Sequence, residues 1–334
     1  MSLHMPAEWE RHERTWMAWP AAGYMGTSVV DSTIEDAYAA WSNVANVIVR
    51  FEPVTMVVDP RDVDIATEWL SPEVELLEAM LDDAWMRDMG PTFVRDDSGK
   101  IQAIDWVFNG WGAQHWAKWD HDAEIAPVVI QSAGVPLVAS PLVNEGGGIH
   151  VNGAGMLLAT RTVQFDPHRN PEATQESVEQ EFARTLGATS VIWIERGLTR
   201  DYEDFGTRGH VDIVACFSDE NTILYHDQQD SNHPDFAVTA QVRATLGRTG
   251  LKLIAVPAPK TIKDEHGFTD YSYINHYVCN GAVILCAFDD PNDEVAQEIM
   301  SKAYPNREIV LVDAREIFAR GGGIHCITQQ QPAE

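Results

Sequence analysis

The sequence predicts an α/β fold in which ββαβ modules repeat around a ring with pseudo-five-fold symmetry. Hairpin signals recur roughly every 60 residues, a period typical of radial or stacked repeats. The two ends of the 334-residue chain supply the parts of one further module. The motif Gly-Gly-Gly-Ile-His occurs at Gly146–His150 and again at Gly321–His325. A similar backbone turn is therefore expected at two distant points of an internally repeated fold.

Four complete modules follow one another between residues 93 and 312. Each opens with a predicted hairpin, and the hairpins span Phe93–Trp106, His150–Gln164, His210–Tyr225 and Tyr273–Phe288. The last one turns at Asn280-Gly281, a dipeptide typical of tight hairpins. The predicted helices begin near His121 and span Pro171–Leu186, Pro234–Leu246 and Pro291–Tyr304. The closing strands are expected at Pro136–Val143, Ser190–Glu195, Leu251–Pro257 and Glu308–Val312.

The chain ends together predict the fifth module. Thr15–Trp19 has the pattern of a strand, and Val54–Val58 that of a closing strand. Between them, Ser32 with Glu35 three residues later forms a capping-box pattern that starts a helix. The missing strand is supplied by Cys326–Gln330, which closes the ring and leaves few free sheet edges.

Two segments fall outside this repeat. Ser71–Leu81 has the composition of an additional helix. Residues 1–4 are interpreted as a cloning remnant ahead of a natural start near Met5, and residues 5–334 as a single catalytic domain.

The composition narrows the possible partners. The formal net charge is −28, which argues against nucleic acid and anionic membranes as partners. It favours a cationic small molecule, although solubility explains the acidic excess equally well. The sequence shows no apolar run of the roughly 18 residues that a membrane span needs, and no secretory signal. A cytoplasmic protein is therefore expected, and a homo-oligomer remains open.

The cysteines and glycine-rich loops indicate neither a metal nor a nucleotide cofactor. Cys216, Cys279 and Cys286 lie in apolar strand-like runs typical of buried structural cysteines. Cys326 differs because it follows three glycines and a histidine. The chain contains no C-x-x-C pair, no H-E-x-x-H motif, and no glycine spacing typical of phosphate binding.

Four polar residues occupy equivalent places in the repeat: Asp88, Glu145, His210 and Cys326. Equivalent positions of radial repeats lie at the same end of the ring, so these side chains are expected to converge. A cysteine thiolate is the strongest nucleophile available near neutral pH. If His210–Phe217 is a strand, His210 and Asp212 point to the same side.

Such a set suits a planar cation, because two carboxylates can grip a guanidinium through paired charged hydrogen bonds. Trp85 is placed to stack on the same cation. Structural interpretations stay open: Asp88 can pair with Arg87, and Glu145 can hold its glycine loop. His150 and His325 are better explained as structural histidines. The acidic stretch that ends at Asp204 is either solvated or part of the rim of the site.

At these residues the chain resembles the agmatine deiminases of the guanidine-modifying, or pentein, superfamily, which share a five-bladed α/β propeller. The resemblance covers nearly the whole chain. Its most specific motif is RGGGIHCITQQQP at Arg320–Pro332. The other matching segments are Met5–Glu10, Thr15–Pro20, Asp83–Val94, Glu145–Gly153 and Gly206–Asp212.

The resemblance implies that Cys326 is the nucleophile and His210 the general acid and base. Asp88 and Asp212 would bind the guanidinium nitrogens, Glu145 would set the protonation of His210, and the substrate channel would be lined by Trp85 and rimmed by Asp204. The implied reaction converts agmatine and water to N-carbamoylputrescine and ammonia through a covalent amidino-thioether, with no cofactor.

The far end of the substrate is not fixed by the resemblance, because the loop Gly197–Gly209 is longer than in plant-like relatives. Arginine, methylarginine and peptidyl arginine remain alternative substrates, and Arg200 or Arg208 would then bind a carboxylate. Amidino transfer is a further alternative. More distant ones are a Cys-His-Asp peptidase and a non-catalytic polyamine-binding protein.

Overall fold

The computed structural model describes residues 2–24, 33–264 and 267–334. The predicted mixed α/β class is confirmed: strands and helices alternate along the chain. Within these residues, five sheets have three or four strands and a sixth has two. Within the described residues, no helix has the length and apolar character that crossing a membrane requires.

The first predicted module is present with nearly the expected bounds. Its elements are β5 (Thr92–Asp96), β6 (Ile101–Val107), the 3₁₀ turn η2 (Asp122–Glu124), α5 (Ile125–Ala133) and β7 (Leu137–Val143). β5 and β6 pair antiparallel, whereas β6 and β7 pair parallel because α5 crosses over between them. The segment β1 (Leu3–His4) adds a further antiparallel strand to β5.

The second module differs from expectation at one place. Its elements are β8 (Ile149–Val151), β9 (Met156–Thr160), α6 (Arg161–Gln164), α7 (Gln175–Leu186) and β10 (Ser190–Ile194). The predicted hairpin is correct up to Thr160, but residues 161–164 form α6 instead of continuing the strand. The helix α7 begins at the capping box of Thr174 and Ser177 and ends at Gly187, whose φ is +68°.

The third module starts later than the sequence suggested. Its elements are β11 (Ala215–Asp219), β12 (Thr222–Asp227), α8 (Asp235–Leu246) and β13 (Lys252–Pro257). The expected strand at His210–Phe217 is wrong for its first five residues. The carbonyl of Val211 instead accepts hydrogen bonds from the N–H groups of Val214 (2.8 Å) and Ala215 (2.9 Å), which form a turn.

The fourth module likewise has a shorter first strand than predicted. Its elements are β16 (Tyr277–Cys279), β17 (Ala282–Ala287), α9 (Asn292–Ala303) and β18 (Glu308–Asp313). The tight turn lies where it was predicted, and Gly281 supplies its positive φ of +77°. The two-stranded sheet of β14 (Lys263–Asp264) and β15 (Gly267–Phe268) precedes this module.

The two chain ends share one sheet, as predicted. Its elements are β2 (His12–Ala18), α1 (Ile34–Ile48), β3 (Val54–Val58), α2 (Val63–Trp69), β4 (Glu75–Glu78) and β19 (Thr328–Pro332). β19 pairs antiparallel with β2, with Thr328 opposite Met17.

Two details of this module were predicted incorrectly. The expected helix at Ser71–Leu81 is wrong, because β4 pairs in parallel with the edge of β3 and the additional helix is α2. Val74, Leu77 and Leu81 have the spacing of a helix, but residues 75–78 pair along the edge of β3 instead. The predicted cap Ser32 lies outside the described residues, and the capping box that starts α1 is formed by Thr33 and Asp36.

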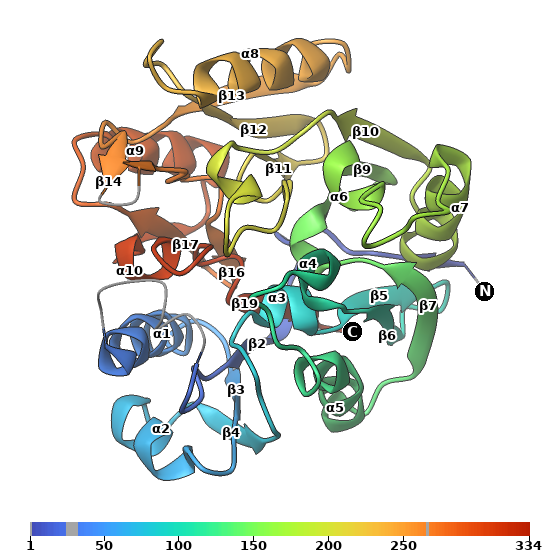
Figure 1. Ribbon diagram of the computed structural model, residues 1–334. Helices are drawn as coiled ribbons and strands as arrows, with labels where there is room; N and C mark the ends of the chain where they lie inside the picture. The colour runs from blue at the N-terminus through green and yellow to red at the C-terminus, as the bar shows by residue number, and fades with distance from the viewer. Residues whose placement is uncertain (1, 25–32, 265–266) are drawn as a thin grey trace.

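The sheets surround the segment that carries α3 (Met86–Met89), with β19 beside it, while α1, α5, α7, α8 and α9 lie outside (Figure 1). The other short helical segments are α4 (Gly110–Ala113), η3 (Gly146–Gly148), η4 (Arg200–Tyr202) and α10 (Arg315–Phe318). Large side chains such as Trp16, Trp19 and Trp41 are fully buried in the core. This packing holds the central loops, which carry the candidate site, on a rigid frame.

Candidate active site

The polar residues singled out in the sequence come from four modules and meet in the interior. Asp88 lies in α3, Glu145 precedes η3, His210 and Asp212 precede β11, and Cys326 precedes β19. All five side chains are at most 5% exposed.

Gly147 shows how closely three of these side chains approach one another. A methyl group added at this residue would lie 2.5 Å from Nδ1 of His210, 3.0 Å from Oδ1 of Asp88 and 3.1 Å from Oδ2 of Asp212. Only a residue without a side chain fits there. The first Gly-Gly-Gly motif therefore lets the backbone pass close to the side chains of Asp88, His210 and Asp212.

The thiol of Cys326 lies beside a carboxylate and an amide. Its Sγ is 3.5 Å from Oδ2 of Asp212 and 3.2 Å from Nδ2 of Asn275. Burial and the carboxylates of Asp212 and Asp88 raise the pKa of this thiol well above its ordinary value. In the absence of a cationic ligand, Cys326 is therefore protonated at neutral pH.

Asn275 is fixed so that its amide N–H group faces the sulfur. The backbone N–H of His325 donates to Oδ1 of Asn275 at 3.0 Å, and Nδ2 lies nearer to Sγ (3.2 Å) than Oδ1 does (3.5 Å). The side chain is fully buried. Sequence reasoning missed this residue, because an asparagine in Ser272–Tyr277 carries no motif of its own.

The imidazole of His210 lies between two carboxylates. Its Nε2 is 3.2 Å from Oε2 of Glu145, and its Nδ1 is 3.8 Å from Oδ1 of Asp88. Burial acts against a charged imidazole, but Asp88 and Glu145 outweigh it and raise the pKa of His210 to about 9. At neutral pH His210 therefore carries a proton that it can give away.

Glu145 is held in its charged form by a buried arginine that was not predicted. Nε of Arg169 donates to both carboxylate oxygens, at 2.9 and 3.1 Å. Burial acts to raise the pKa of Glu145, but Arg169 and His210 outweigh it and lower the pKa to about 2. Arg169 also donates to Oδ2 of Asp166 at 2.9 Å and to the carbonyl of Thr207 at 2.7 Å.

Asp88 faces the site and does not pair with its neighbour Arg87. It accepts from Nε1 of Trp111 at 2.8 Å and from the N–H of Gly147 at 3.0 Å. Burial raises the pKa of Asp88 to about 6, although the charge of His210 opposes the shift. Such a carboxylate gains by receiving a cation.

Asp212 belongs to a chain of buried charges that ends near the N-terminus. Its Oδ2 lies 2.8 Å from Nδ1 of His325, whose Nε2 is 2.9 Å from Oε1 of Glu8. Burial acts to raise the pKa of Asp212, but His325 outweighs it and lowers the pKa. Oδ1 of Asp212 has no hydrogen-bond partner among the described residues. His325 thus orients a carboxylate that retains an unused acceptor.

The two residues expected to line the substrate channel lie at different depths. A methyl group added at Gly322 would be 2.8 Å from the ring of Trp85 and 3.0 Å from Sγ of Cys326, so Trp85 closes the site beside the sulfur. Asp204 is exposed, and its Oδ1 lies 3.9 Å from Nε2 of His115.

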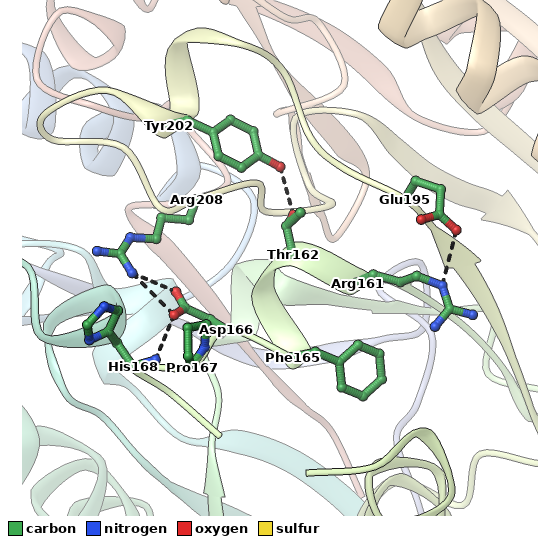
Figure 2. A pocket seen from close by; sticks show the side chains of 9 residues that line it. All are labelled: Arg161, Thr162, Phe165, Asp166, Pro167, His168, Glu195, Tyr202 and Arg208. Atoms are coloured by element: carbon green, nitrogen blue, oxygen red, sulfur yellow. Dashed lines mark hydrogen bonds and ion pairs between the residues drawn. The ribbon is translucent and has the colours of Figure 1, made fainter. Parts of the chain in front are cut away.

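A cavity of about 590 Å³ is lined by Asp166, the second carboxylate that Arg169 binds. Figure 2 shows Arg208 reaching Asp166, with Tyr202 bonded to Thr162 across the same cavity. Its lining does not include Cys326 or the residues around the sulfur. Since Asp166 also binds Arg169, ion pairs connect this cavity to Glu145 and thus to His210.

No group of three or more histidine, cysteine, aspartate or glutamate side chains within the described ranges is arranged to hold a metal ion. The arrangement is instead a buried thiol facing carboxylates, with a protonated imidazole beside them. This chemistry suits attack on the carbon of a bound cation.

Comparisons with known proteins agree with this arrangement. Residues 4–332 match the family described as Porphyromonas-type peptidyl-arginine deiminase. An agmatine deiminase of Stutzerimonas stutzeri is 35% identical, and the alignment covers 99% of this chain and 95% of that one. The chain belongs to the agmatine deiminase family. This family is part of the pentein superfamily.

Further relatives support the same assignment over the full length. A Streptomyces coelicolor protein, provisionally named as an agmatine deiminase, is 55% identical over 99% of both chains. The solved structure of the agmatine deiminase of Enterococcus faecalis, described as catalysing its reaction, superimposes with a TM-score of 0.90. It is 31% identical, and the match covers 99% of this chain and 96% of that one.

Proposed function

We propose that this member of the family hydrolyses agmatine to N-carbamoylputrescine and ammonia. The observation that carries the proposal is the meeting of Cys326 with Asp212 at 3.5 Å, in a site where Asp88 and His210 lie next to the same Gly147. Full-length relatives that are named agmatine deiminases support the choice of substrate.

The guanidinium group binds between Asp88 and Asp212. Each carboxylate can accept two hydrogen bonds from a planar cation, and Oδ1 of Asp212 is still unused. Binding both sides of the cation fixes its carbon close to Sγ of Cys326, which removes much of the entropic cost of attack. Trp85 covers the cation beside the sulfur.

The substrate itself activates the nucleophile. Asp88 and Asp212 raise the pKa of the empty site's thiol, and a bound cation neutralises that effect. The thiol then loses its proton to solvent, and the amide N–H of Asn275 stabilises the thiolate from 3.2 Å. A reactive thiolate thus forms only where there is a cation to attack.

In the first half of the reaction, an S–C bond forms between Cys326 and the guanidinium carbon. The protonated His210 donates its proton to one NH₂ group, the C–N bond breaks, and ammonia leaves. The enzyme now carries a cationic amidino-thioether, and His210 is neutral. Glu145, 3.2 Å from Nε2, orients the imidazole throughout.

In the second half of the reaction, the oxygen of a water molecule attacks the same carbon while neutral His210 takes a proton from that water. The C–S bond breaks, the thiolate of Cys326 leaves, and the ureido product is released. The remaining hydroxyl proton is taken up by ammonia in solution. Dividing the reaction at a covalent intermediate lowers each barrier.

The peptidase alternative is disfavoured by what surrounds the sulfur. Peptide hydrolysis needs N–H groups aimed at a developing oxyanion, whereas Cys326 here faces the carboxylate of Asp212, with Asp88 nearby. Asp88→Asn separates the two reactions: guanidine hydrolysis should fall at least 100-fold, since one half of a charged clamp is lost. Unchanged turnover would contradict the guanidine mechanism.

The same proposal includes the arrangement of the sheets, the metabolic role and the cellular location. We read the five larger sheets as the blades of a five-bladed α/β propeller. Its support is that each of these five sheets joins an antiparallel pair to a parallel strand. The product, a carbamoylated diamine, places the enzyme in polyamine and putrescine formation, and a cytoplasmic location fits that role.

The experiment that tests the function is the release of ammonia and ureido product from a panel of guanidino compounds. The panel contains agmatine, arginine, methylated arginines and a peptidyl arginine, with Cys326→Ala as the blank. Agmatine should be the best substrate, and the blank should be inactive. A requirement for an added amine acceptor, with little ammonia, would favour amidino transfer instead.

A further inference from the structure

A small cavity of about 40 Å³ lies against the loop that carries the nucleophile. Its lining includes Arg200, Asp204, Phe205, Asp270, Phe318 and Gly321. Three of these residues, Arg200, Asp204 and Phe205, come from the loop Gly197–Gly209, and Asp270 belongs to no motif used above. The cavity is thus distinct from the residues that hold the guanidinium.

The position of the cavity is fixed by consecutive residues of the second glycine motif. Gly321 lines the cavity, and Gly322 is the residue at which an added methyl group would lie 3.0 Å from Sγ of Cys326. The Cα atoms of Gly321 and Gly322 are about 4 Å apart, so the residue that lines the cavity directly precedes the residue closest to the sulfur. A methyl group at Gly321 would meet the carbonyl oxygen of Phe205 at 2.5 Å, so the two loops are in direct contact.

The charges in the cavity are mostly negative. Asp270 is only 8% exposed, and its Oδ1 has no hydrogen-bond partner among the described residues. Arg200 is already bound to Oδ2 of Asp264 at 2.5 Å. Asp204 lies at the exposed edge. A buried carboxylate with an unused acceptor is costly unless a donor reaches it.

We infer that Asp270, with Asp204 at the edge, forms a subsite for the primary ammonium group at the far end of the guanidino substrate. The inference rests on the proposed function, and it names the residues that select agmatine among guanidino compounds. In an extended agmatine, six bonds of about 1.5 Å separate the guanidinium carbon from the ammonium nitrogen and span about 7 Å. Because Gly321 and Gly322 are consecutive, a chain of this length that is bound at the sulfur can extend toward the cavity that Gly321 lines.

The same subsite discriminates against substrates that end in a carboxylate. The carboxylate of arginine would face the carboxyl groups of Asp270 and Asp204, and the positive charge of Arg200 is already paired with Asp264. Burial raises the pKa of Asp270 to about 7, although Arg200 opposes the shift. An arriving ammonium group stabilises the charged form of this carboxyl, as does any nearby cation.

The test compares agmatine with 1-butylguanidine, which has the same chain without the amine. Binding is measured by calorimetry on the Cys326→Ser protein, so that no turnover interferes. Agmatine should bind about tenfold tighter or more, as expected for a hydrogen bond between charged groups. In Cys326→Ser carrying Asp270→Asn, this preference should fall to about threefold or less, while 1-butylguanidine binds as before.

Two further variants make the result decisive. Asp204→Asn changes an exposed carboxylate and leaves the buried Asp270 in place. It should reduce the preference for agmatine by a smaller, salt-sensitive factor. Asp64→Asn removes one exposed charge on α2 and should leave the preference unchanged. Equal binding of the two ligands by the Cys326→Ser protein, or an undiminished preference in a folded Asp270→Asn protein, would overturn the subsite. Binding of neither guanidine would instead overturn the proposed function.

Discussion

Replacing Asn275 by aspartate tests how the buried nucleophile is made reactive. The substitution keeps the shape of the side chain and the oxygen that accepts from His325 at 3.0 Å, but it removes the N–H group 3.2 Å from Sγ. A hydrogen bond to a charged group contributes about 1.5–3 kcal/mol, which corresponds to about one to two pKa units. The pKa of the Cys326 thiol should therefore rise in Asn275→Asp by at least this amount, because a charged carboxylate beside Sγ raises it as well, as Asp212 does.

The expected change in reactivity is smaller than the change in thiolate population. Below the pKa, the thiolate fraction falls about 10- to 100-fold, but a more basic thiolate is intrinsically more nucleophilic, which recovers about half of the logarithmic loss. Alkylation of Cys326 by iodoacetamide at a fixed neutral pH should then slow by about three- to tenfold.

The assay is the rate of iodoacetamide alkylation as a function of pH in the ligand-free protein. Cys326→Ala measures the background from Cys216, Cys279 and Cys286. Asn152→Asp is the matched control, because this buried asparagine contacts the backbone of Glu220 and not the sulfur. An alkylation midpoint in Asn275→Asp that equals the wild-type value would refute the reasoning.

The remaining predictions concern the neighbouring charges and the backbone. Gly147→Ala should abolish turnover, since its methyl group would lie 2.5 Å from the imidazole of His210; steady-state rates on folded protein check this. Glu145→Gln should lower the pKa of His210 from about 9 toward its ordinary value, so the basic limb of the kcat profile should move to lower pH. Arg169→Gln leaves Glu145 buried without its partner and should cost about 3–5 kcal/mol in urea unfolding. The folded protein keeps the proton on Asp83 up to a pKa of about 7 because of burial, so this group should lower the unfolding free energy by up to about 4 kcal/mol as pH rises from about 4 to 7; in melts at pH 5 and 8, Asp83→Asn should make the fall smaller by this contribution, while the buried Asp88 and Asp270 keep theirs.

The repeat was predictable because its signals are local. The Asn280-Gly281 turn and the apolar strands on either side specify one hairpin, and the β2–β19 pairing follows once four modules are counted. The segment at Ser71–Leu81 was mispredicted because its secondary structure depends on pairing with the free edge of β3, and those residues do not show that this edge exists. His210–Val214 was mispredicted because the hydrogen bonds at Val211 close a turn there.

The convergence of Cys326 with Asp88, Glu145 and His210 was predictable because these residues occupy equivalent places in the repeat. The residues that support them were not, since Arg169, Trp111 and Asn275 act through partners 24, 23 and 51 positions away. One signal was available in the sequence: a buried cluster of acids requires cations and donors nearby, so an arginine such as Arg169 had to exist somewhere. Its position, however, follows only from the packing of η3 against the loop after α6.

The most direct test of the central claim is mass spectrometry of the protein quenched in acid during turnover of agmatine. The peptide that contains Cys326 should gain the mass of agmatine less ammonia, and the modified fraction should disappear once substrate is exhausted. Steady hydrolysis of agmatine by a Cys326→Ala protein, with no adduct on any peptide of the wild type, would contradict the account.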